Sequence, residues 1–136
     1  YTLHLTQGFT PTADRVDVLG TVGSPVPLRV RGQLGWRQGP VALNAFVNFV
    51  DGYQDQTITP AQHVQAWTTT DLQLSYAFQA KSGPLSGLRA ALSVSNLFDK
   101  DPPFAPLRTS TSTIGFNPDN ASPEGRVVSL QVTKAW

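Results

Sequence analysis

The last eleven residues of the chain, 126–136, alternate between two kinds of side chain. One parity is apolar apart from Arg126 at its start and Lys134, and its apolar members are Val128, Leu130, Val132 and Trp136. The other parity carries the small polar residues Ser129, Gln131 and Thr133. A two-residue period places alternate side chains on opposite faces of an extended chain. The segment therefore predicts a half-buried β-strand that ends on an aromatic residue.

Five further segments show the same two-residue period, and glycines and prolines separate them. With the last segment, the predicted strands are 1–7, 28–37, 41–50, 68–78, 88–98 and 126–136. We expect an all-β fold, an antiparallel up-and-down meander of about six strands.

The connections between these strands alternate in length, which favours a particular kind of meander. Residues 8–27, 51–67 and 99–125 form long connections, whereas 38–40 is short and 79–87 is intermediate. Transmembrane β-barrels have short turns at one side of the membrane and long loops at the other. Tilted strands of about ten residues also span roughly 23 Å of hydrocarbon. The pattern predicts a segment of a transmembrane β-barrel.

Composition excludes several other classes of protein. Charged residues make up 14% of the chain, below the roughly 25% of an ordinary soluble domain. Ten Lys and Arg against nine Asp and Glu leave no basic run for nucleic acid. No apolar run approaches the roughly 18 to 20 residues of a membrane-spanning helix. The chain has no cysteine and no methionine, so we expect a processed product or an excised fragment.

Aromatic and charged residues refine the barrel hypothesis. Aromatic residues at strand ends are typical of the two belts that lie at headgroup level, although ordinary core aromatics remain the alternative. The predicted belt residues are Trp36, Phe49, Phe78, Phe98 and Trp136. The predicted lumen-facing polar residues are Arg29, Arg31, Asp71, Gln73 and Arg89.

Three stretches near the end of the chain resemble the C-terminal end of TonB-dependent outer-membrane receptors. They read NLFDKDPPF at 96–104, GFNPDNA at 115–121 and GRVVSL at 125–130, continuing to Trp136. FTPT at 9–12, DRVD at 14–17 and WTTTDLQL at 67–74 are also similar to that family. Lys134 departs from the aromatic or apolar residue that is more usual in the family.

The resemblance implies that residues 1–136 are the C-terminal part of a 22-stranded barrel domain in the bacterial outer membrane. In the family a plug domain fills the barrel, and the TonB complex energises uptake of a siderophore, cobalamin or an oligosaccharide. This chain holds neither the plug nor the TonB-contacting region, so we expect it not to transport alone. The resemblance also implies that Val128, Leu130, Val132 and Trp136 act as a signal for the outer-membrane assembly machinery. The expected partners are therefore the lipid bilayer, the plug domain, the TonB complex and that machinery.

No pattern for catalysis, a metal or a cofactor is found, and we expect no enzyme activity. His4 and His63 are too far apart in sequence for a metal-ligand motif. The carboxylates at Asp51, Asp55, Asp99 and Asp101 lack the spacing of a calcium loop, and we expect those carboxylates to cap turns. No serine-hydrolase elbow or phosphate loop is present. The alternative function is a soluble all-β binding module with a sandwich-like core, and the transported ligand cannot be named from this sequence.

Overall fold

The computed structural model describes residues 2–7, 16–108 and 113–135. None of these residues forms a helix, so the described part of the chain contains no helix that could span a membrane. The chain divides into two compact units. We call them the loop unit, Tyr1–Val30, Phe49–Thr68 and Asp101–Pro123, and the sheet unit, Arg31–Asn48, Thr69–Lys100 and Glu124–Trp136.

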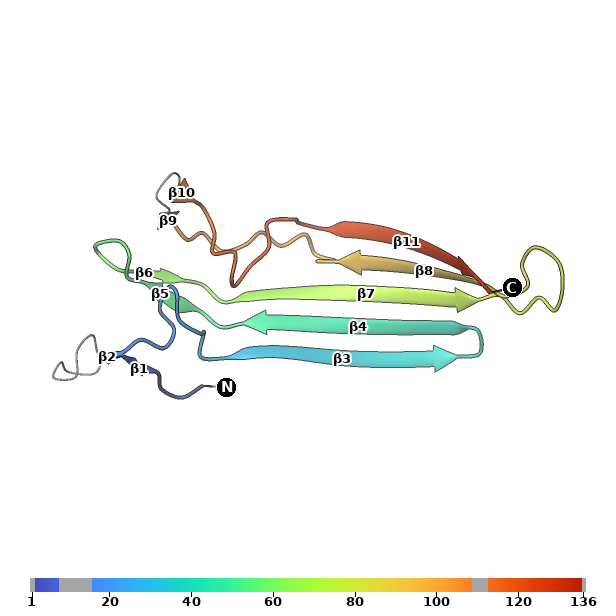
Figure 1. Cartoon of the computed structure of the whole chain (residues 1–136), viewed down its shortest axis with the longest axis horizontal. Helices are drawn as coiled ribbons and strands as arrows, with labels where there is room; N and C mark the ends of the chain where they lie inside the picture. The colour runs from blue at the N-terminus through green and yellow to red at the C-terminus, as the bar shows by residue number, and fades with distance from the viewer. Residues whose placement is uncertain (1, 8–15, 109–112, 136) are drawn as a thin grey trace. The chain divides into compact units, whose positions relative to one another are not determined.

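Five long strands form one antiparallel sheet in the order β11-β8-β7-β4-β3 (Figure 1). Their bounds are β3 Arg29–Gln38, β4 Val41–Val50, β7 Trp67–Ala77, β8 Leu88–Ser95 and β11 Val127–Lys134. Each long strand pairs with the next long strand along the chain, which makes the sheet an up-and-down meander. The all-β class and the meander are confirmed.

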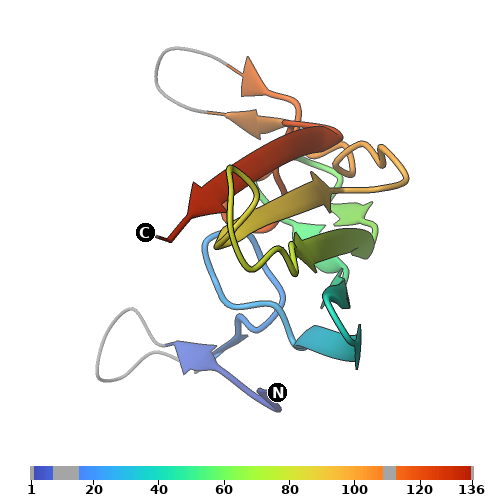
Figure 2. The ribbon, with the colours of Figure 1, turned by 90° about the vertical axis from the view of Figure 1, so that its right-hand side faces the viewer.

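The sheet is open, with β3 and β11 as its two edge strands among the described residues. Figure 2 shows that the five strands are not coplanar and that the sheet curves from β3 to β11. Curvature of this kind follows from the right-handed twist of paired strands.

The prediction of a sixth long strand at residues 1–7 is wrong. Only β1, Thr6–Gln7, is a strand there, and it pairs with β2, Val16–Asp17. The preceding backbone donors are used elsewhere, because Thr2 N donates to Pro27 O and Leu5 N donates to Asp17 Oδ1. Residues 2–5 therefore do not form a strand paired with β3.

Two more short pairs lie inside the long connections. β5, Tyr53–Asp55, pairs with β6, Gln62–Val64, and β9, Leu107–Arg108, pairs with β10, Thr113–Ile114. Strand β8 is shorter than predicted, because Asn96 takes a positive φ of 49° and ends the extended backbone. These differences leave the five long strands within a few residues of their predicted bounds.

The buried hydrophobic residues of the described part of the chain all belong to the loop unit. They are Val26, Val50, Tyr53, Val64, Ala105 and Ala121. The buried residues described in the sheet unit are Thr69 and Asn96, and both are polar. The sheet unit is therefore held by its hydrogen-bond ladder, without a dry apolar core among its described residues.

Candidate functional site

The strand register gives the sheet two chemically different faces. Directly paired residues of antiparallel strands point to the same side. Leu92 of β8 pairs with Leu74 of β7 and with Leu130 of β11, so an apolar row crosses three strands. On either side of this row lie the other residues of the same face: Leu72, Tyr76, Leu88, Ala90, Val94, Val128, Val132 and Lys134.

This apolar face is exposed. Leu130 is 71% exposed, Leu92 is 41% exposed and Leu34 of β3 is 76% exposed. Other large residues of the face exposed by at least a third are Val30, Trp36, Leu43, Val47, Leu74, Tyr76, Val128 and Val132. The largest exposed apolar patch of an ordinary soluble monomer covers only a few hundred Å². Larger patches are typical of surfaces that contact other proteins or lipid, and this one follows all five strands.

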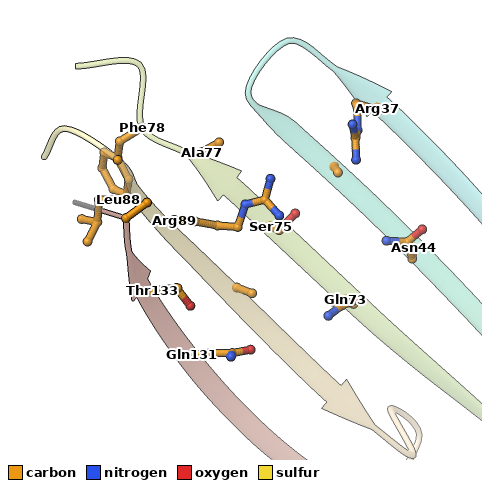
Figure 3. Close-up of a pocket in the computed structure, with 14 residues that line it drawn as sticks. Arg37, Asn44, Gln73, Ser75, Ala77, Phe78, Leu88, Arg89, Gln131 and Thr133 are labelled. Atoms are coloured by element: carbon orange, nitrogen blue, oxygen red, sulfur yellow. The ribbon is translucent and has the colours of Figure 1, made fainter. Parts of the chain in front are cut away.

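The opposite face is polar and concave. A hollow of about 690 Å³ is lined by residues from every strand of the sheet. Its polar lining residues, labelled in Figure 3, are Arg37, Asn44, Gln73, Ser75, Arg89, Gln131 and Thr133. Because residues from all five strands line a single hollow, the sheet must curve around this side. We call this side of the sheet the polar face.

Asp71 and Arg31 lie toward one end of the polar face, and Arg37 and Arg89 lie toward the other. Asp71 accepts a hydrogen bond from Asn48 Nδ2 at 2.9 Å and from the Asn96 backbone N–H at 2.9 Å. The Arg31 guanidinium lies 4.9 Å from the centre of the Phe46 ring, a cation–π contact. Arg37 and Arg89 line the hollow at the other end of the sheet.

The turn after β8 is held by a set of hydrogen bonds that we call the Asn96 clamp. Asn96 Nδ2 donates to Lys100 O, and Lys100 N donates to Asn96 Oδ1, each at 3.0 Å. Asp99 Oδ1 then accepts the Arg126 N–H at 2.7 Å, just before β11 begins. The clamp thus joins the end of β8 to the start of β11, and it gives a physical reason for residues of the NLFDKD and GR stretches.

Four of the five residues predicted to face a lumen lie in the sheet unit, on its polar face. Gln73 and Arg89 line the hollow, Asp71 shares the parity of Gln73, and Arg31 shares the parity of Arg37. Arg29 belongs to the loop unit, where its Nη2 donates to Asp119 O at 3.0 Å and to Asn120 Oδ1 at 2.7 Å. A lumen stays a prediction for all five.

The predicted belt aromatics lie near strand ends. Trp36 is 53% exposed, three residues before the Gly39–Pro40 turn. Phe78 follows β7 and packs edge to face against Tyr76, with ring centroids 5.0 Å apart. Phe49 lies near the other end of β4, and Phe98 lies beyond β8 in the turn, 73% exposed. Phe98 was predicted inside a strand, which is wrong because the backbone turns at Asn96.

The predicted assembly signal lies on edge strand β11. Val128, Leu130 and Val132 are at least 60% exposed on the apolar face, whereas Trp136 lies outside the described residues. Lys134 shares the apolar face, and its Nζ donates to Pro84 O at 3.0 Å. The ammonium is thus satisfied at the end of the sheet.

The loop carboxylates cap turns. Asp51 Oδ1 accepts Gly52 N–H at 2.8 Å, and Asp55 Oδ1 accepts Thr57 N–H at 2.9 Å. Asp17 accepts hydrogen bonds from His4 and from the backbone of Leu19 and Leu5, which lower the pKa of its carboxyl group. Over the described residues, no group of three or more His, Asp or Glu side chains is placed to hold a metal ion.

Tyr53 is the largest member of the small core in the loop unit, and it is 4% exposed. Burial raises the pKa of its phenol, and hydrogen bonds with Asn117 and Asn120 act in the opposite direction. The tyrosine thereby ties the β5 strand to the GFNPDNA stretch within this unit.

Sequence reasoning missed Arg37 and the clamp as sites. Arg37 has the same parity as Arg29 and Arg31, so the period could have marked it. The roles of Asn96 and Asp99 follow from a positive φ at each residue, 49° and 54°, which no periodicity indicates.

Comparison of the chain with protein-family models, with curated proteins and with solved structures gives no match.

Proposed function

We propose that the five-stranded sheet is part of the wall of a transmembrane β-barrel in a bacterial outer membrane. In this proposal the apolar face contacts lipid and the polar face lines a hydrated lumen. The resemblance of the NLFDKDPPF, GFNPDNA and GRVVSL stretches to TonB-dependent receptors supports assignment of the barrel to that family. The function would then be a share in energy-coupled uptake of a scarce ligand.

The observation that carries the proposal is the exposed apolar face over a sheet unit with no buried apolar residue among those described. Burying one large aliphatic side chain stabilises a folded protein by roughly 1.5–3 kcal/mol. A face of about ten such residues, each exposed by 37–76%, therefore forgoes on the order of 10 kcal/mol in water. Hydrocarbon around a barrel is a solvent in which that exposure has no cost.

The lengths of three strands and the order of the connections agree with the proposal. β3 and β4 have 10 residues each and β7 has 11, within the roughly 9–11 of a tilted transmembrane strand, and β8 and β11 have 8 each. In the up-and-down order, the short connection 39–40 and the intermediate connection 78–87 join strand ends on one side of the sheet, and the long connections 51–66 and 96–126 join strand ends on the other. Outer-membrane barrels have short periplasmic turns and long extracellular loops.

Five strands are fewer than the eight of the smallest outer-membrane barrels. The proposal therefore requires that other strands pair with the free edges of β3 and β11. The plug domain, the TonB complex and the assembly machinery enter as partners of the whole receptor, and β11 carries the proposed assembly signal.

The test is whether the apolar face contacts lipid. The chain with Trp67→Phe and Trp136→Phe keeps Trp36 as its only indole, and it is folded into phosphatidylcholine vesicles with bromine at defined acyl depths. We expect flotation with the vesicles and quenching of Trp36 by bromines near the headgroups. A monomer that stays folded in water without detergent and does not float would contradict the proposal and favour the soluble binding module.

A further inference from the structure

Two arginines share a small hollow at the end of the polar face nearest the Gly39–Pro40 turn. Arg37 of β3 and Arg89 of β8 both line a space of about 60 Å³, together with Ser75 of β7. Both also line the larger hollow of about 690 Å³ (Figure 3). In Figure 3 the Arg89 side chain extends from β8 toward Ser75. Arg37 and Arg89 therefore border one common space.

These two charges are not compensated by the residues around them. None of the described residues that line either hollow is acidic. Within the described residues, no hydrogen-bond or ion-pair partner is found for either guanidinium. Asp71 is on the same face but lies far from Arg89 along the strands. Arg89 pairs with Ala77 of β7, and Ala77 is six residues, or roughly 20 Å at 3.3 Å per residue, from Asp71. The Asp71 carboxylate is also already engaged by Asn48 and Asn96.

We propose that Arg37 and Arg89 bind one oxyanion group, a carboxylate or a phosphate, in the small hollow. Planar guanidinium groups bind both of these anions through paired N–H donors. The small hollow of about 60 Å³ exceeds the roughly 10–15 Å³ of cavity that holds one water molecule, so it has room for a single anionic group. The amide and hydroxyl groups of Asn44, Gln73, Gln131 and Thr133 line the larger hollow beside it, where they suit the neutral polar part of a ligand.

This site goes beyond the proposed membrane function, since it needs only the sheet unit and its polar face. The anionic group has two possible sources, a free small anion or an acidic side chain of a polypeptide. The experiment includes a probe for each source.

The test is a titration of the chain in zwitterionic detergent micelles at low salt, followed by NMR of the arginine Nε–Hε groups. The free-anion probes are citrate and inorganic phosphate, and the polypeptide probe is acetyl-Asp-Asp-amide. We expect saturable shifts of Arg37 and Arg89, and no saturable shift of Arg31, which is on the same face against Phe46. Arg37→Gln or Arg89→Gln should weaken binding about tenfold or more, because each removes a charge-assisted contact.

Arg31→Gln is the matched control, since it removes one positive charge from the same face, and it should change the affinity less than twofold. Backbone spectra of the three variants check that the sheet is retained, and Arg89→Lys should keep part of the binding through its charge alone. Saturation by citrate or phosphate identifies a free anion, and saturation by the peptide alone identifies an acidic side chain. Absence of saturation with all three probes, or equal losses in all three glutamine variants, would overturn the site.

Discussion

At the scale of single residues, the Asn96 clamp sets where β11 starts. Asp99 holds the Arg126 N–H, and the residue before it, Gly125, has a φ of +63°. A Cβ added at Gly125 would lie 2.9 Å from Asp99 Oδ1, which is too close. Glycine at this position is therefore required both by its backbone conformation and by the carboxylate beside it.

Gly125→Ala should destabilise the sheet more than an alanine at another glycine with positive φ. Gly39 is the matched control, since its φ is +54° and nothing lies within 4 Å of an added Cβ. In both variants the positive φ should lower the free energy of unfolding by about 1 kcal/mol. In Gly125→Ala the displaced hydrogen bond to Arg126 should lower it further, by about 1–3 kcal/mol. Urea unfolding in micelles measures both, and equal losses would show that the clamp does not stabilise β11.

The β1–β2 pair should depend on pH through Asp17. Its pKa is lowered by the hydrogen bond from His4 and by the Leu19 and Leu5 N–H groups. Because the folded pKa lies below the unfolded value, the stabilisation is present above the unfolded pKa and is lost as pH falls through the folded one. Amide exchange of Leu5 and Leu19 should therefore accelerate only below about pH 4. In Asp17→Asn the acceleration should disappear, and a wild-type transition near neutral pH would contradict the assignment.

At the scale of elements, periodicity predicts the long strands and misses the short ones. The predicted strand 41–50 coincides with β4, and 28–37 and 68–78 each differ from β3 and β7 by one residue at each end. A strand of ten residues with one polar face shows a two-residue period that can be recognised in the sequence. Short pairs such as β5 and β6 depend instead on contacts that form only in the folded chain. The predicted strand at 1–7 fails because its donors bind Pro27 and Asp17, a long-range choice that local alternation does not record.

The candidate sites divide in the same way. Parity predicts which residues of one strand share a face with Gln73 or with Arg89. The strand register is needed as well to place Gln73 and Arg89 on the same face of the sheet. That Arg37 and Arg89 line the same hollow can be predicted only from the strand order, since β4 and β7 lie between their strands. The sequence therefore predicts which residues of a strand share a face, but it does not predict which residues of different strands line the same hollow.

Within one strand, the same substitution should be harmful at one residue and tolerated at its neighbour. Leu92→Arg places a charge at the centre of the apolar row, where an arginine facing lipid costs about 2–4 kcal/mol. Ser93→Arg places the same charge on the polar face, since Ser93 pairs with Gln73 and Ser129. We expect Leu92→Arg to reduce folding into vesicles, measured by flotation and protease protection, and Ser93→Arg to leave it nearly unchanged. Equal loss in both variants would remove the distinction between the two faces.

At the scale of the whole molecule, the two units are stabilised differently. The loop unit has a small dry core around Tyr53 and Val64, as an ordinary water-soluble structure does. The sheet unit exposes its apolar residues and buries polar ones among those described. Under the proposed membrane function, transfer from lipid or detergent to water should therefore destabilise the sheet unit before the loop unit.

If the apolar face contacts lipid as proposed, replacing four exposed leucines with threonine should remove the need for lipid or detergent. Leu34, Leu74, Leu92 and Leu130 lie on the apolar face and are exposed by at least 41%. Threonine keeps the β-branched preference for strands while removing apolar surface. We expect the variant to remain folded after detergent removal, by circular dichroism and sedimentation, and to stop floating with vesicles. The same four positions changed to valine should keep the detergent requirement. If the leucines formed a dry core instead, the threonine variant would unfold, because each buried leucine lost would cost about 2–5 kcal/mol.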